Sequence, residues 1–187
     1  MRLFIAVTFN DEVKGRLLEV QERIKARSAR GNFTGRENIH LTLAFIGETA
    51  PGLVPHIVSV IKNALEGAPG SFTLNFRKTG CYGRGGKELW WIGPGDSAEN
   101  RAAIAALEEI RRRIAVGLDG AGIPYDRRPF RAHITLGREI KPAAPIIPFE
   151  TAVPVPVNRI SLMRSEHAGG KLVYSEIFGQ NLEETQR

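Results

Sequence analysis

The sequence predicts one domain, residues 1–187, in which helices and strands form two similar lobes. Three observations predict this fold class. The order strand, helix, strand occurs once in each half of the chain. The second strand of each unit carries the same His-x-Thr pattern, about half the chain length apart. No segment has the length of a linker between independent domains. We interpret the repeated pattern as an internal duplication.

Apolar periodicity locates the elements of the first half. Residues 2–9 run apolar and are typical of a buried strand, and a helix that begins at Asp11 carries apolar residues at helical spacing. Residues 39–46 form a second apolar strand. A further helix is expected from Pro51 to about Glu66, because proline is favoured in the first turn of a helix.

The second half contains a hairpin, a long helix and a closing hairpin. Strict alternation and Gly-rich turns mark its strands. In chain order we expect a strand at 72–76, a turn at 83–86, a strand at 88–92, a helix at 97–115, a loop at 117–131, a strand at 132–138, a Pro-rich segment at 142–156, and strands at 158–165 and 171–178 around a Gly-Gly turn.

Composition favours a globular protein with an anionic partner. Hydrophobic residues make up 42% of the chain and charged residues 25%, and the net charge of +6 favours binding to anions. Cys81 is the single cysteine, so no intrachain disulfide forms, as is usual in a reducing cytoplasm. No apolar stretch approaches the roughly 20 residues of a membrane span. We expect a cytoplasmic protein with no membrane partner.

The two repeated motifs place an imidazole beside a hydroxyl. In a strand, residues two apart point to the same face, so each histidine shares a face with its threonine. The apolar residue between them points to the other face and anchors the strand in the core. One such motif is weak, because a single histidine in an apolar strand is usually structural. Two at matched positions indicate function: His40-Leu41-Thr42 and His133-Ile134-Thr135.

Two histidines and two threonines in one cleft suit chemistry at phosphorus. One imidazole activates a nucleophile while the other protonates the leaving oxygen on the opposite side. The threonine hydroxyls donate hydrogen bonds to the non-bridging oxygens of the pentavalent state. This set supports in-line displacement, and we expect neither a metal nor another cofactor.

Other chemistries lack their sequence patterns. Four histidines and one cysteine, without His-Glu-x-x-His, do not form a typical zinc set. Gly86-Lys87 and Gly170-Lys171 lack the spacing of a P-loop, and no Gly-x-Ser-x-Gly elbow occurs. His56 and His167 have no threonine two residues later, so we interpret both as structural.

Longer segments around the motifs carry a family resemblance. With the paired motifs, they make the chain similar to the 2H phosphoesterase superfamily, in particular to the LigT-like RNA 2′,3′-cyclic phosphodiesterases, also called 2′-5′ RNA ligases. One departure is Ala132, where the family usually has proline before the second histidine. The segments are Arg2–Val7, Glu37–Gly47, Trp90–Gly93, Phe130–Arg138 and Ser161–Ser165.

The resemblance implies a fold and a reaction. The fold is α+β, with two pseudo-symmetric lobes whose antiparallel sheets flank a central cleft and whose helices lie on the outside. The reaction opens the 2′,3′-cyclic phosphate at an RNA end to a 2′-phosphomonoester. In it His40 protonates the departing 3′ oxygen and His133 activates water. Thr42 and Thr135 bind the phosphoryl oxygens, and Arg138 adds positive charge.

Alternatives stay open at the level of sequence. The substrate is RNA with a cyclic phosphate end, or a small molecule such as a cyclic nucleotide or an ADP-ribose cyclic phosphate. The same site also permits 2′-5′ joining of RNA ends, and a binding module without turnover is a further alternative. Tyr125, Phe130 and Tyr82 either stack on a terminal base or pack within the fold. We expect a monomer.

Overall fold

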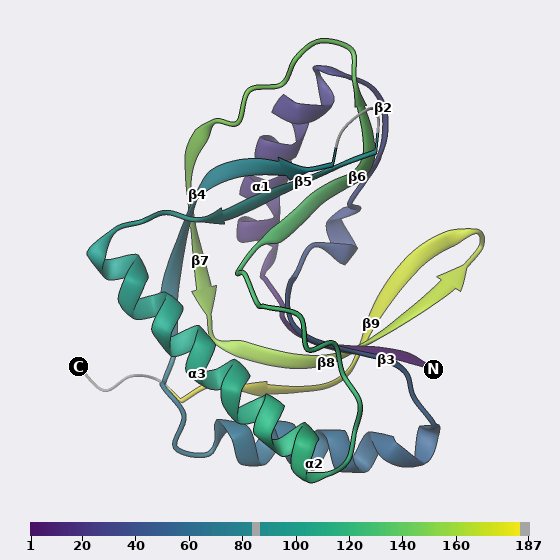
Figure 1. Ribbon diagram of the computed structural model, residues 1–187, viewed down its shortest axis with the longest axis vertical. Coiled ribbons are helices and arrows are strands. Elements are labelled where there is room, and N and C mark those ends of the chain that lie inside the picture. The colour runs from purple at the N-terminus through teal and green to yellow at the C-terminus, as the bar shows by residue number, and fades with distance from the viewer. Residues whose placement is uncertain (84–86, 184–187) are drawn as a thin grey trace.

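The computed structural model describes residues 1–83 and 87–183 and gives an α+β fold (Figure 1). In chain order its elements are β1 (Arg2–Val7), α1 (Asp11–Lys25), β2 (Ser28–Phe33), β3 (Leu41–Glu48), α2 (Val54–Leu65), β4 (Phe72–Tyr82), β5 (Glu88–Pro94), α3 (Ala98–Gly120), β6 (Ile134–Pro142), β7 (Glu150–Val157), β8 (Arg159–Ala168) and β9 (Lys171–Asn181). Short 3-10 turns at Arg36–Asn38 and Pro51–Leu53 precede β3 and α2. Residues 84–86 of the expected turn at 83–86 lie outside the described residues.

The strands form one antiparallel sheet that divides naturally into two lobes. Its order is β7-β4-β5-β6-β3-β1-β8-β9. Strand β2 also pairs with β6, on the edge of β6 that faces away from β5 and that meets β3 at its start. A single register pair, Leu41 with Ile134, joins β3 to β6. We call β3, β1, β8 and β9 the terminal lobe, and β2, β6, β5, β4 and β7 the central lobe. The two motif strands therefore belong to different lobes and meet at the junction.

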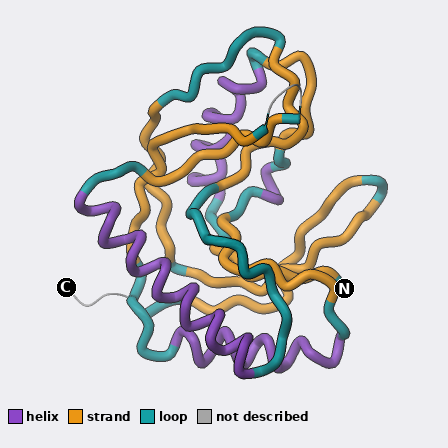
Figure 2. The backbone as a smooth tube through the Cα atoms, in the orientation of Figure 1, coloured by secondary structure: helices purple, strands orange, loops and turns teal. Residues whose placement is uncertain are grey.

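The helices cover the lobes in an order that does not follow the chain. Helix α1 leaves the terminal lobe after β1 but contacts β2, β6 and β7 of the central lobe. Helix α2 contacts α3 and β9, and α3 contacts β3 and β4. Figures 1 and 2 show α1 at the upper end of the molecule and α2 and α3 together at the lower end. Each lobe is therefore assembled from separate stretches of the chain.

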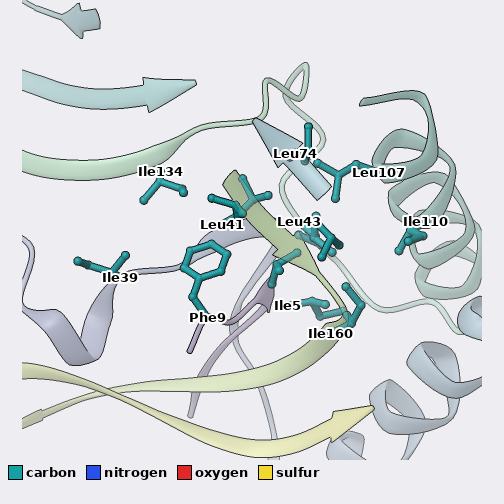
Figure 3. Close-up of a cluster of buried hydrophobic side chains, with 14 of the residues drawn as sticks. Ile5, Phe9, Ile39, Leu41, Leu43, Leu74, Leu107, Ile110, Ile134 and Ile160 are labelled. Carbon is teal, nitrogen blue, oxygen red and sulfur yellow. The ribbon is translucent and has the colours of Figure 1, made fainter. Parts of the chain in front are cut away.

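The apolar core holds the lobe junction in place. Leu41 and Ile134 are both 0% exposed and belong to the same cluster as Leu43, Leu74 and Leu107 (Figure 3). Burial of one such side chain stabilises a fold by about 1.5–3 kcal/mol. These two residues are also the middle residues of the His-x-Thr motifs, so the core fixes both motifs from behind.

Two strands occur where the sequence predicted none. Strand β7 lies in the Pro-rich segment 142–156, with Val153, Val155 and Val157 buried in alternation. Among the described strands it lies at the edge of the sheet and pairs with β4 alone. Pro154 and Pro156 are tolerated there because an edge strand leaves backbone N–H groups unpaired. Strand β2 is polar and partly exposed, so it has no apolar alternation to reveal it.

Helix α3 is longer than the sequence predicted. It continues to Gly120, through the first residues of the loop expected at 117–131. Leu118 is 0% exposed and extends the buried face of the helix. Gly117 permits close packing on α2, because a Cβ there would lie 2.7 Å from a methyl group of Val60. None of the described helices combines the length and the apolar character needed to cross a bilayer.

Candidate active site

A cavity of about 400 Å³ lies where the two lobes meet. It brings together both motif histidines, both motif threonines and Arg138. Its lining residues come from the β1, β3, β6, β8 and β9 segments: Arg2, Phe4, His40, Thr42, Phe45, His133, Thr135, Arg138, Ser165, His167, Leu172 and Tyr174.

The sequence predicted each histidine inside a strand, at 39–46 and at 132–138. This was wrong by one residue, because each histidine lies immediately before its strand. Strand β3 begins after His40 and β6 begins after His133, and each threonine is the second residue of its strand. In both cases Nδ1 of the ring donates to the backbone carbonyl two residues earlier, at 2.7 Å to Asn38 and 2.8 Å to Arg131. This local turn explains why the histidine backbone stands outside the ladder.

Both ring nitrogens of His40 are engaged. A carbonyl oxygen can only accept, so the bond to Asn38 fixes the proton on Nδ1. Nε2 is then an acceptor, and the Thr42 hydroxyl donates to it at 2.9 Å. His40 and Thr42 therefore share a face, as the sequence predicted, and a hydrogen bond connects them.

Aromatic rings shield His40 from water. The ring centroid of Phe4 lies 4.8 Å from that of His40, and Tyr174 packs edge-on at 5.2 Å. Burial lowers the pKa of His40 from 6.5 to about 4, opposed by the hydrogen bond to Asn38 and assisted by the charges of Arg138 and His133. His40 is consequently neutral at pH 7.

His133 has a more open environment. Its Nδ1 bond to Arg131 leaves Nε2 as the nitrogen that accepts a proton. Within the described residues, no aromatic ring packs against His133 and no hydrogen bond joins it to Thr135. The backbone carbonyl of Thr135 accepts from the Thr34 hydroxyl at 3.0 Å, which ties the start of β6 to the end of β2.

The cavity is suited to an anion. Arg2 and Arg138 both line it, no carboxylate does, and neither arginine forms an ion pair within the described part of the chain. Burial raises the pKa of Tyr174, although the charges of Arg138 and Arg2 oppose this, so its hydroxyl stays protonated and able to donate. Residues 1–83 and 87–183 contain no cluster of three His, Cys, Asp or Glu side chains arranged to hold a metal ion.

Asn38 connects the His40 turn to the β8–β9 hairpin. Its side-chain amide donates to the carbonyl of Leu172 at 2.8 Å, and its Oδ1 accepts from the backbone N–H of Tyr174 at 3.1 Å. Its own carbonyl holds His40. Asn38 is only 9% exposed, so one buried residue positions both the histidine and the hairpin that forms a wall of the cavity.

Sequence reasoning missed the residues that reach the cavity from distant strands. His167 was interpreted as structural but lines the cavity, as do Tyr174 and Leu172 across the same hairpin. A usable signal existed in β1, where Arg2 and Phe4 alternate with the fully buried Leu3. An arginine on the same face as an aromatic residue, in an otherwise apolar strand, indicates a face turned away from the core.

Tyr125 and Phe130, for which the sequence left stacking on a base and packing in the fold as alternatives, are not among the lining residues. The Tyr125 hydroxyl donates to Asp119 at 3.3 Å. Phe130 lies under the guanidinium group of Arg111, at 5.0 Å. Both contacts are with residues of α3. A larger hollow, about 610 Å³, lies between α2 and α3, but it contains neither motif.

The fold and the cavity together define a two-histidine phosphoesterase. The sequence model of the 2'-5' RNA ligase superfamily matches residues 11–169, and the chain belongs to this family. It is 31% identical over 169 residues to an RNA 2',3'-cyclic phosphodiesterase of Thermus thermophilus, covering 89% of this chain and 82% of that protein. A solved structure from Thermus thermophilus aligns over 100% of both chains, with a TM-score of 0.76 and 28% identity. The structure of E. coli LigT complexed with 3'-AMP aligns over 97% of both chains, with a TM-score of 0.72 and 25% identity.

Proposed function

We propose that this protein hydrolyses the 2′,3′-cyclic phosphate at the end of an RNA chain to a 2′-phosphomonoester. The observation that carries the proposal is the convergence of two His-x-Thr motifs, one from each lobe, in one basic cavity. The name of the Thermus thermophilus relative and the nucleotide in the E. coli LigT structure support the same substrate class. The four motif residues that line the cavity belong to the same chain, so the proposed site needs no second copy, and a monomer in the cytoplasm stays part of this proposal.

The proposed reaction is a single in-line displacement at phosphorus. His133 Nε2 takes a proton from water as the water oxygen bonds to phosphorus, and the bond from phosphorus to the 3′ oxygen breaks on the opposite side. His40 Nε2 gives its proton to that 3′ oxygen. The hydroxyls of Thr42 and Thr135 donate hydrogen bonds to the non-bridging oxygens, and Arg138 supplies positive charge. The phosphate stays on the 2′ oxygen.

His40 requires a proton before it can act as the acid. Without a phosphate beside it, burial holds the pKa of His40 at about 4, so at pH 7 it carries no proton on Nε2. A phosphate anion next to His40 favours the charged imidazolium and raises this pKa. Binding of the substrate is then accompanied by uptake of a proton at His40 Nε2. The Thr42 hydroxyl then donates its hydrogen bond to a phosphate oxygen in place of Nε2.

The same geometry accommodates RNA joining. If the 5′-hydroxyl group of a second RNA replaces water, the displacement produces a 2′-5′ phosphodiester and releases the same 3′ oxygen. Hydrolysis is favoured where water is the abundant nucleophile, so we assign it as the main reaction.

The test is a short RNA that ends in a 2′,3′-cyclic phosphate, incubated with the protein in EDTA. The double variant His40→Ala, His133→Ala, purified in parallel, controls for contaminating nucleases. We expect the wild type alone to produce a 2′-phosphate, resolved from the 3′-isomer by chromatography. A 3′-phosphate product, or equal product from the double variant, contradicts the proposal.

A further inference from the structure

We propose that Trp91 and Tyr82 form a stacking platform for the nucleobase of the nucleotide whose cyclic phosphate occupies the cavity. This inference rests on the proposed function and adds a binding subsite to it. Neither residue lines the cavity itself. Both lie on the central lobe, in the two strands that follow β6 across the sheet.

The register places Trp91 directly beside the reaction site. Trp91 on β5 pairs with Thr135 on β6, and directly opposed residues of antiparallel strands point to the same face. The neighbouring pair, Ile92 with Ile134, is fully buried on the other face. The indole therefore extends the face that carries Thr135 away from the cavity.

Glycines on either side leave room for the indole to lie flat. Gly80 is the register partner of Trp91 on β4, and a Cβ at Gly80 would lie 2.4 Å from the indole ring. A Cβ at Gly93 would lie 3.0 Å from the same ring. Any larger residue at Gly80 would displace the ring, so the sequence here keeps a broad aromatic surface parallel to the sheet.

Tyr82 continues this surface by one strand. It lies two residues after Gly80 on β4, its ring centroid is 5.4 Å from that of Trp91 at an interplanar angle of 31°, and it is 43% exposed. An exposed aromatic ring beside a phosphate-binding cavity is a typical surface for stacking on a nucleobase.

The two adjacent tryptophans differ in burial: Trp90 is packed in the core, and Trp91 is partly exposed. Trp90 is 1% exposed, and its Nε1 donates to Glu88 at 2.9 Å. Trp91 is partly exposed, and its Nε1 is shielded from water without a hydrogen-bond partner among the described residues. Buried indole N–H groups usually find a partner. The fold therefore secures Trp90 as core and leaves Trp91 turned toward the substrate side.

The dimensions fit one nucleotide. Neighbouring strands lie about 4.8 Å apart, which places the backbone of Trp91 about 5 Å from that of Thr135. Tyr82 lies one strand further and opposite Leu89, so it is also displaced along the strand direction. A phosphate held at Thr135 brings its own base over this platform. Stacking tolerates every base, because each has a π-face, so we expect little preference among the four nucleotides.

The kinetic test compares two substrates that differ only at the base. One is an RNA ending in a nucleoside 2′,3′-cyclic phosphate, and the other ends in the abasic ribose 2′,3′-cyclic phosphate. We expect the wild type to favour the first by roughly 5- to 150-fold in kcat/KM, and Tyr82→Ala and Trp91→Leu to reduce this preference. Phe178→Leu, which removes an aromatic ring that does not line the cavity and lies 5.6 Å from the Lys62 ammonium group, retains it. Equal rates on both substrates with the wild type would overturn the platform.

A binding test keeps the platform separate from the proposed activity. Adenosine 2′-monophosphate should quench the fluorescence of the wild type, inorganic phosphate should not, and Trp91→Phe, which keeps Trp90, should lose the response. If the wild type hydrolyses neither substrate but shows this quenching, the proposed function fails and the platform stands. If adenosine 2′-monophosphate and phosphate act alike, the platform is wrong whatever the activity.

Discussion

His40 and His133 share a motif and a backbone device but have different surroundings. Each donates from Nδ1 to the carbonyl two residues earlier, so the same tautomer is set in both lobes. His40 is then enclosed by Phe4 and Tyr174 and bonded to Thr42, whereas His133 has no such enclosure in the described residues. The motif fixes ring orientation, and the lobe around it sets the proton affinity.

The His-x-Thr strand is repeated in both lobes, whereas the side chains that surround each histidine are not. We propose that the two motif strands derive from one duplicated unit, since Leu41 and Ile134 also occupy matching positions at the lobe junction. The small apolar cluster of Phe4, Ala6 and Met163 belongs to the terminal lobe. The same motif therefore stands in two different settings, and the aromatic enclosure that lowers the pKa of His40 is found in the terminal lobe.

The largest effect is expected from removing either histidine. His40→Ala and His133→Ala should each lower kcat by on the order of 10²–10⁴, because each removes one proton-transfer group. The double variant should be little worse than either single variant, since residues that act as a unit are not additive. Initial rates on RNA with a cyclic phosphate end measure this. Near-normal activity in one single variant would remove that histidine from the mechanism.

Replacing the threonines should have an intermediate effect. Thr42→Val and Thr135→Val keep the side-chain shape but remove a donor to the phosphoryl oxygens, which we expect to lower kcat/KM by on the order of 10²-fold each. Thr42→Val also removes the hydrogen bond to His40 Nε2. Serine at either position should restore most of the rate. A serine variant as slow as the valine variant would show that the methyl group, and not the hydroxyl, matters.

A smaller change should alter the proton affinity of His40 alone. Tyr174→Ala admits water to the ring and should raise the pKa of His40 from about 4 toward 6.5, whereas Tyr174→Phe keeps the ring and the low pKa. NMR titration of the His40 ring measures both variants. If the pKa stays near 4 in Tyr174→Ala, burial by this ring is not its cause.

The same pKa makes stability depend on pH in a defined window. The unfolded chain binds the His40 proton with a pKa of 6.5 and the folded chain with a pKa of about 4, so the unfolded state holds more protons between these values. The contribution of His40 to stability is present above pH 6.5 and is lost as the pH falls toward 4. Tyr174→Ala should narrow the pH range over which the unfolded chain binds the His40 proton more tightly than the folded chain does.

Local pattern was sufficient for the centre of the site. The alternation in His40-Leu41-Thr42 and in the second motif already implied two imidazoles with neighbouring hydroxyls, and the core position of the middle residue follows from the same period. The α+β class, the antiparallel strands and the outer helices were also predicted and are confirmed.

The remaining features depend on contacts between distant parts of the chain. Tyr174 and His167 reach the cavity through the register of β8 with β9, which no local pattern specifies. Helix α1 packs on β2, β6 and β7 of the central lobe and not on the terminal lobe that precedes it in the chain. Tertiary contacts decide this, and the local sequence does not specify them. Strand β7 was missed because proline argues against a strand unless its place at the sheet edge is known.

The smallest expected effect on rate concerns the residue that connects His40 to the hairpin. Asn38→Ala leaves the carbonyl of Leu172 and the N–H of Tyr174 without their partner, and should lower the free energy of unfolding by about 1–3 kcal/mol. Asn100→Ala is the matched control, because Asn100 is 0% exposed and its side chain bonds backbone groups of Asn75 and Gly95 away from the cavity.

Both variants should be destabilised to a similar degree in urea, but only Asn38→Ala should lower kcat by several-fold and raise the pKa of His40, because its hairpin wall loosens and water reaches the ring. Unchanged kcat and His40 pKa in Asn38→Ala would show that the hairpin keeps its place without this link. Equal loss of kcat in Asn100→Ala would assign the effect to global stability. The pair therefore distinguishes a residue that positions the cavity wall from one that only holds the fold.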